Sequence, residues 1–194
     1  MTKNEFLHKF QLNSLSASTQ NFRYNHKFKH AAVLIPIIEV DLPDNGKQLN
    51  IILTKRASHL KHHPGQISFP GGKVEMTDKT IIETALRETH EEIGLPPKII
   101  DVIGQLHPYH TITGYIITPI IGLVTANDPM VIDKNEVEEV FQVPLHHFLN
   151  QENHHTVNVM QQKIQHKVHF MPYGNYNIWG ATAAILKDFA AHLE

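Results

Sequence analysis

Hydrophobic residues along the chain fall into short runs of strand type and a few segments of helical spacing. The strand-type runs are rich in Val and Ile and are bounded by Gly, Pro, Asn or Asp, a composition typical of buried strands and the turns between them. These runs cover residues 31–40, 49–55, 66–69, 99–106, 115–125, 137–143 and 167–171. The first two flank a turn sequence at 43–46, which predicts a hairpin.

Pro36 interrupts the first of these runs. Proline has no backbone N–H to donate, and in sheets it is confined to edge strands, first positions and bulges. We therefore expect this strand to lie at an edge of the sheet or to be bulged at Pro36.

Helical spacing is clearest from Thr80 to Ile93, where apolar side chains recur every three or four positions. Asp78 or Thr80 can cap the start of this helix, and Gly94, followed by two prolines, ends it.

Further helices are predicted at both ends of the chain. The segment 1–25 has a weakly amphipathic pattern through Phe6, Leu7 and Phe10, and the segment 178–193 carries Ala, Leu and Phe at helical spacing. A helical turn is expected after Pro144. With no repeats and no internal linker, the pattern predicts one α/β domain over residues 1–194, with a mostly mixed sheet.

Composition narrows the functional classes. The chain has 194 residues, 41% of them hydrophobic, and a net charge of −2, which suits a single core and gives no bulk attraction to nucleic acid or anionic membranes. It has no cysteine, which excludes disulfides, thiolate metal sites and thiol nucleophiles. No signal-peptide pattern and no run of about 20 apolar residues occurs. We expect a cytoplasmic monomer or homodimer that binds a small-molecule substrate, and neither nucleic acid nor membrane.

Three carboxylates, those of Glu88, Glu91 and Glu92, lie in the last turns of the predicted helix. The C-terminal end of a helix carries partial negative charge, and Glu88 and Glu92 lie four apart on one face, where like charges repel. A hard divalent cation that prefers oxygen ligands is the most natural compensation. Arg87, four residues before Glu91, can pair with it and offset part of the charge.

The turn Gly71-Gly72 precedes this helix, and glycines let a ligand or metal approach the main chain. Turn and helix together resemble the box of the Nudix hydrolase superfamily, G-x5-E-x7-R-E-U-x-E-E-x-G-U, in which U is a bulky aliphatic residue. The matching positions are Gly72, Arg87, Glu88, Glu91, Glu92, Gly94 and Leu95. The chain departs from the box in three ways: Gly72 and Arg87 are one residue further apart, Asp78 stands for the first Glu, and Thr89 replaces an aliphatic.

This resemblance implies an α/β/α sandwich, with a mixed, curved sheet between helices and the acidic helix against one face. It also implies hydrolysis of a pyrophosphate with Mg²⁺ or Mn²⁺, since such ions neutralise phosphates and acidify a bound water. Glu88, Glu92 and then Glu91 are the expected metal ligands, and the Gly71 carbonyl can add an oxygen. The general base stays open between Glu88 and an acidic residue of the stretch 133–139, with Glu136 preferred.

The segment 53–72 is similar to the signature L-L-T-x-R-[S/A] … G-x3-F-P-G-G of the coenzyme A pyrophosphatase branch. Segments 31–36, 136–145 and 178–183 resemble the same branch. The resemblance implies cleavage of coenzyme A or a derivative into 3′,5′-adenosine bisphosphate and 4′-phosphopantetheine. Guanidinium and ammonium groups suit a nucleotide phosphate. The expected substrate contacts are Arg56, Lys61, Gly65, Gln66 and Gly72.

Two alternatives stay open. One is a Nudix hydrolase of another nucleoside diphosphate derivative, such as ADP-ribose, a dinucleotide or a nucleoside triphosphate. The other is a non-catalytic, ligand-sensing Nudix domain, which the intact carboxylates disfavour. For Trp179 we favour packing in the core or against a helix over a base-stacking platform, and Phe141 is expected in the core.

Overall fold

A mixed sheet forms the centre of the protein in the computed structural model, which describes residues 1–13, 28–43, 46–126, 129–161 and 164–194. The strands are β1 (Lys29–Asp41), β2 (Lys47–Arg56), β3 (Ile67–Ser68), β4 (Gly71–Lys73), β5 (Ile100–Gln105), β6 (Tyr109–His110), β7 (Tyr115–Val124), β8 (Val137–Pro144), β9 (His155–Gln161) and β10 (Ile164–Phe170). The helices are α1 (Lys3–Leu12), α2 (Ile81–Ile93), α3 (Leu145–Leu149) and α4 (Ala181–His192), with 3₁₀ turns η1 (Pro97–Ile99) and η2 (Gln151–Asn153).

The main sheet runs in the order β3-β2-β1-β7-β5, with β8 also on β2, β4 on β1 and β6 on β7. β1 and β7 are parallel, whereas the other pairs of this sheet are antiparallel. The predicted mixed sheet is therefore confirmed. The predicted hairpin is confirmed by the pairing of β1 with β2, in which Ile37 lies opposite Ile51; positions 44 and 45 of its turn lie outside the described residues.

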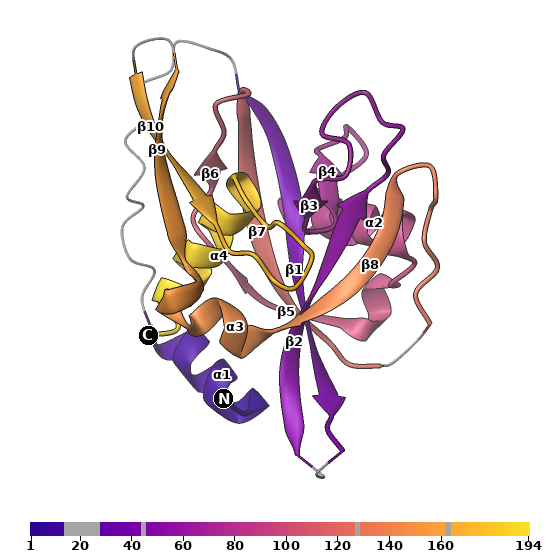
Figure 1. The fold of residues 1–194 in the computed structure, drawn as a ribbon. Coiled ribbons are helices and arrows are strands. Elements are labelled where there is room, and N and C mark those ends of the chain that lie inside the picture. Colours follow the sequence, from indigo (N-terminus) through magenta and orange to yellow (C-terminus); the bar gives the residue numbers. More distant parts are fainter. Residues whose placement is uncertain (14–27, 44–45, 127–128, 162–163) are drawn as a thin grey trace.

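Helices cover both faces of this sheet (Figure 1). On one face, Ala85 and Ile93 of α2 pack against a cluster that includes Ala32 and Leu34 of β1. On the other face, α1, α3 and α4 contribute side chains to a larger cluster that contains Phe148 and Phe189. The arrangement is the α/β/α sandwich that the sequence predicts, with the acidic helix against one face.

The expectation for Pro36 is wrong, because β1 has partners along both sides. β7 pairs with it continuously from Lys29 to Ile38, and the other side is shared between β4 and β2. Leu34 donates its N–H to the carbonyl oxygen of Pro70, on the side of β1 where β4 lies. Residues two apart in a strand have the same orientation, so the backbone nitrogen of Pro36 is on this side as well. Position 36 therefore faces the gap between β4 and β2, where no N–H is needed.

The C-terminal region differs most from the prediction. The predicted strand at 167–171 is β10, but its partner β9 was missed, and the two form a separate hairpin. The last helix begins at Ala181 rather than at residue 178, because the N–H of Met171 bonds to the carbonyl oxygen of Ile178 and keeps this segment extended. Among the described residues, none of the helices combines the length and apolar character that crossing a membrane demands.

The predicted N-terminal helix is present as α1, capped by Thr2, and residues 14–25 of that prediction lie outside the described part. Phe6 is fully buried, and its ring lies 6.1 Å from that of Phe189 in α4. The Lys9 ammonium donates to the carbonyl oxygen of Leu193 at 2.7 Å. The two ends of the chain therefore close one side of the core together.

Removing the Phe6 ring should show how much this closure contributes. Phe6→Ala should lower the free energy of unfolding by about 3–5 kcal/mol, because a large buried ring is replaced by a cavity. Leu12→Ala, in the same helix but at a side chain that is 80% exposed, should change it by less than about 0.5 kcal/mol. Urea denaturation measures both, and equal values for the two variants would contradict the packing described.

Candidate active site

The acidic end of α2 touches the Gly-Gly turn at two points, through Glu88 at Gly72 and through Glu92 at Gly71. Glu88 is directed at Gly72 so closely that a Cβ on this glycine would lie 2.4 Å from the carboxyl carbon. Only a residue without a side chain leaves room for the carboxylate here. The side chain of Glu88 is 15% exposed. The glycine thus fixes the distance between the turn and the helix.

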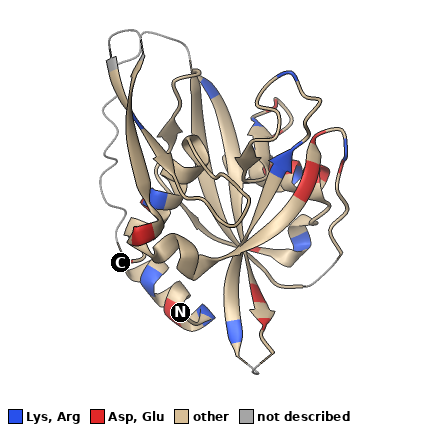
Figure 2. Ribbon diagram, viewed as in Figure 1, with Lys and Arg blue, Asp and Glu red and all other residues tan. Residues whose placement is uncertain are grey.

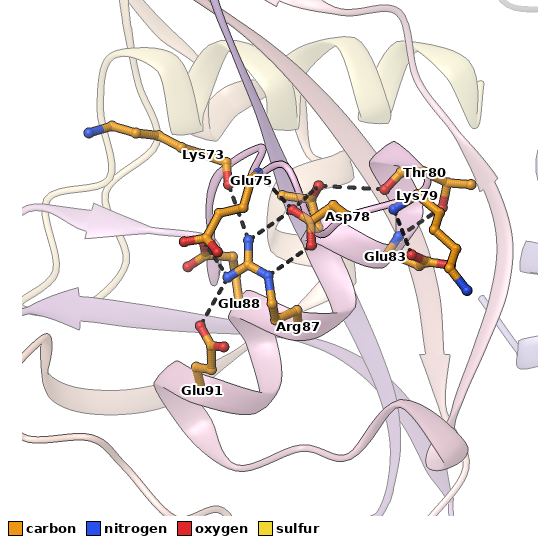
Figure 3. A network of polar contacts seen from close by, with 10 residues as sticks. Lys73, Glu75, Asp78, Lys79, Thr80, Glu83, Arg87, Glu88 and Glu91 are labelled. Carbon is orange, nitrogen blue, oxygen red and sulfur yellow. Dashed lines mark hydrogen bonds and ion pairs between the residues drawn. The ribbon is translucent and has the colours of Figure 1, made fainter.

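Arg87 is the centre of the polar network at this end of α2 (Figure 3). Its Nε and Nη2 donate to the two carboxylate oxygens of Asp78 at 2.9 and 3.0 Å. Its Nη1 donates to Glu88 at 2.9 Å and to Glu91 at 3.0 Å, and Nη2 also reaches the carbonyl oxygen of Lys73 at 3.2 Å. The predicted pairing of Arg87 with Glu91 is therefore confirmed, but it is a minor part of the network.

Asp78 is the residue whose role sequence reasoning missed. Its side chain is only 4% exposed, and besides Arg87 it accepts hydrogen bonds from the Thr84 hydroxyl and the Glu75 N–H, each at 2.9 Å. The hydrogen bonds from Arg87 hold the pKa of Asp78 well below its usual range. The start of the helix is capped instead by Thr80, which accepts from the N–H of Glu83. The sequence signal for this role was the position of Asp78, which stands where the box has its first Glu.

Glu92 is 5% exposed and accepts a hydrogen bond from the N–H of Gly71 at 3.2 Å. Burial raises its pKa to about 8. The Gly71 N–H and the charge of Arg56 act against this shift, while Glu136 and Glu88 add to it. Glu92 is therefore a carboxyl group that exchanges its proton near neutral pH in the absence of a bound cation.

Burial also raises the pKa of Glu88, against the effect of Arg87 and with help from Glu91 and Glu136. Glu136 precedes β8 and is exposed, and its charge reaches both Glu88 and Glu92. In Figure 2 the acidic positions of α2 and of β8 lie on the same side of the molecule. The structure thus brings Glu136, a predicted catalytic residue, to the acidic helix.

The donor set of this region suits a hard cation. Each of Glu88, Glu91 and Glu92 accepts through one carboxylate oxygen, and among the residues that the structure describes the other oxygen accepts no hydrogen bond. Carboxylate oxygens are the ligands that Mg²⁺ prefers. Within the described ranges, no three Asp, Glu or His side chains already converge on one point, and Arg87 engages one oxygen each of Glu88 and Glu91. Glu91 is also the most open of the three, at 57% exposure.

The predicted substrate contacts are brought together in part. The 57–66 loop closes onto Arg56, whose N–H donates to Gln66 at 3.0 Å and whose carbonyl oxygen accepts from Gly65 at 3.1 Å. Arg56 lies close enough to Glu92 to lower its pKa, and Gly72 contacts Glu88. Lys61, in the same loop, is exposed, and no contact links it to the carboxylates among the described residues.

Two further side chains singled out from the sequence, Thr89 and Phe141, differ in how far they are buried. Thr89, where the box has an aliphatic residue, is fully buried, and its hydroxyl donates to the carbonyl oxygen of Ala85 at 2.6 Å. The helix thereby satisfies the one polar atom that the substitution adds. Phe141 is half-buried rather than fully in the core, and it stacks on Tyr176 at 3.7 Å between ring centroids.

Removing the Asp78 carboxylate should loosen the whole network. Asp78→Ala should lower the free energy of unfolding by about 2–3 kcal/mol, somewhat less than for a fully buried pair, because Arg87 is 23% exposed. Since the folded-state pKa of Asp78 is depressed, this contribution is present above about pH 4 and is lost as the pH falls further. Denaturation at pH 7 and at pH 3 measures it. Glu75→Ala, which removes an exposed side chain, is the control, and an equal effect of both variants would contradict the assignment.

Comparison with known proteins places this geometry in a family. The NUDIX domain model matches residues 29–162. A Yersinia pestis protein described as an uncharacterized Nudix hydrolase, NudL, is 40% identical over 194 residues, covering 98% of this chain and 94% of that protein.

Solved structures show the same fold. A MutT/nudix family protein from Enterococcus faecalis aligns with a TM-score of 0.52 at 16% identity, over 98% of this chain and 74% of that one. The Nudix hydrolase RenU from M. smegmatis aligns with a TM-score of 0.50 at 21% identity, over 61% and 71%. Nudix enzymes generally act on small nucleotide substrates with divalent metal ions. This chain belongs to the Nudix family and is a Nudix hydrolase.

Proposed function

We propose that this Nudix hydrolase cleaves the pyrophosphate bond of coenzyme A or a derivative, giving 3′,5′-adenosine bisphosphate and 4′-phosphopantetheine. The observation that carries the proposal is the position of Arg56. This residue belongs to the segment that resembles the coenzyme A signature, it holds the 57–66 loop through Gly65 and Gln66, and its charge acts on Glu92. One residue therefore links the expected substrate loop to the acidic helix.

The metal ligands in this proposal are Glu88, Glu92 and Glu91, with the Gly71 carbonyl as an additional oxygen. Bound Mg²⁺ or Mn²⁺ neutralises the diphosphate and acidifies water. The second carboxylate oxygens of the three glutamates, which accept no hydrogen bond among the described residues, support this assignment. The contact between Glu88 and Gly72 also supports it, because it brings a carboxylate against the Gly-Gly turn.

Proton transfer in this proposal falls to Glu136. The side chain of Glu136 is exposed, and no hydrogen bond engages it in the described part of the chain, so it is free to accept a proton from water. Glu88 is less suited to this task because it is bonded to Arg87 and is needed for the cation. Arg87, held by Asp78, keeps Glu88 and Glu91 in place and stays charged throughout.

A substrate panel tests the proposed reaction. With Mg²⁺ or Mn²⁺ the protein should convert coenzyme A into the two products above, identified by mass spectrometry, and should act less efficiently on ADP-ribose, dinucleotides and nucleoside triphosphates. Loss of an outer-shell partner of a metal typically costs up to about 100-fold. Glu92 is proposed as a direct ligand, so Glu92→Gln should reduce kcat by more than about 100-fold while the protein stays folded. Efficient cleavage of ADP-ribose with coenzyme A left intact would reject the substrate, and full activity of Glu92→Gln would reject the metal assignment.

Metal binding should release a proton from Glu92. Its raised pKa, about 8, leaves the carboxyl group mostly protonated at pH 7, and a cation binds only the ionised form. Mn²⁺ affinity should therefore rise with pH up to about 8, with about one proton released per ion at pH 7.

Calorimetry in two buffers of different ionisation enthalpy measures this proton. Glu92→Gln should abolish the release, whereas Glu83→Gln, in the first turn of the same helix, should leave it intact. Release that persists in Glu92→Gln would assign the proton to another group.

A further inference from the structure

Trp179 is the single tryptophan of the chain. Of the two packing positions expected for it, in the core or against a helix, the structure contradicts the first. Residue 179 lies in the segment that joins β10 to α4, and it is 40% exposed. An exposed indole leaves a large apolar surface in water, which is unfavourable unless something covers it.

The exposed ring is held in a defined position. Phe170 and Trp179 form an isolated antiparallel bridge, and the N–H of Gly180 donates to the carbonyl oxygen of His169 at 2.9 Å. The Phe170 ring lies nearly parallel to the indole, at an interplanar angle of 15° and 6.3 Å between centroids. Phe170 therefore lies beside the indole with its ring nearly parallel but offset, and the bridge fixes the backbone of both residues.

This position adjoins the expected substrate loop. A Cβ on Gly180, the next residue, would lie 3.8 Å from the side-chain nitrogen of Gln66. The hydroxyl of Thr182 donates to the carbonyl oxygen of Ile67 at 3.0 Å. Gln66 is bonded to Arg56 and lies five residues before Gly71, which is at most about 17 Å of extended chain. Trp179 thus stands beside the strand that leads to the Gly-Gly turn.

We propose that Trp179 is the stacking platform for the adenine base of the nucleotide substrate. The inference rests on the proposed function and deepens it, because it assigns one end of the substrate to one side chain. A base offers a flat π-face that matches the indole, whereas the pantetheine arm has none, and base–aromatic stacking is a sizeable contribution to nucleotide binding. Arg56, beside Gln66, is then placed for the phosphates of the same nucleotide.

Fluorescence of the unmodified protein tests the contact directly. Because Trp179 is the only tryptophan, emission excited selectively over tyrosine reports on this residue alone. Adenosine 3′,5′-bisphosphate should quench or shift the emission saturably, whereas ribose 5-phosphate, which carries phosphate but no base, should not. Binding of the bisphosphate by calorimetry without any change in emission would overturn the proposal, as would an equal change with ribose 5-phosphate.

Variants separate stacking from a structural role. Trp179→Ala should raise KM for coenzyme A about tenfold, equivalent to about 1.4 kcal/mol, with kcat changed less than about threefold. Trp179→Phe, which keeps a ring, should restore most of the loss, and Leu12→Ala, at a distant exposed apolar side chain, should have no effect. An unchanged KM in Trp179→Ala would overturn the proposal. If Trp179→Ala does not fold, the fluorescence titration of the unmodified protein decides.

The two proposals fail in distinguishable ways. If the protein cleaves ADP-ribose and not coenzyme A, the proposed substrate is wrong, yet quenching by adenine nucleotides still tests the platform, because both substrates carry adenine. If coenzyme A is cleaved and adenosine 3′,5′-bisphosphate binds without affecting Trp179, the substrate stands and the platform is wrong.

Discussion

The ion pair between Arg87 and Asp78 is the interaction on which the site depends. Carboxylates near the C-terminal end of a helix are unfavourable, and α2 carries three of them within five residues. Arg87 offsets part of that charge and is itself oriented by a two-point contact with a buried carboxylate. Because Asp78 is bonded at the same time to Thr84 and to the loop after β4, the acidic turn of the helix and the Gly-Gly turn keep a fixed relation.

Burial and charge then give the glutamates different properties. Glu91 is open to solvent, Glu88 is partly covered and bonded to Arg87, and Glu92 is buried against the N–H of Gly71. Because Glu92 is buried, its pKa is raised to about 8. Without a cation, a protonated Glu92 lowers the negative charge of this region. Binding of a cation would release that proton and restore the charge of the carboxylate. In the proposed function, the residues that join the helix to the Gly-Gly turn are therefore also the ones that bind the cation.

The acidic helix and its limits could be predicted from the sequence, because the residues that start, fill and end this helix are close together in the chain. The helix of Glu88 and Glu92 has a strong apolar period, a capping threonine and a terminal glycine, and its limits were predicted to within one residue. The role of Asp78 depends on a contact nine residues away through a loop, which no periodicity reports. β9 does carry the alternating residues Val157 and Val159, but both are exposed, at 50% and 43%, and the hairpin that β9 forms with β10 is separate from the main sheet. The exposure of Trp179 is likewise a feature of the tertiary structure, which no hydrophobic pattern reports. Pro36 was misplaced because a split in the partners of β1 is a tertiary feature.

The central claim is that the carboxylates of α2 hold a divalent cation beside the Gly-Gly turn. Anomalous X-ray scattering from crystals grown with Mn²⁺ tests it most directly, because the signal locates the ion without assumptions about activity. The account predicts an anomalous peak bounded by the carboxylates of Glu88 and Glu92 and adjacent to Gly71. A fully occupied peak on histidine side chains elsewhere, with none at α2, would contradict it.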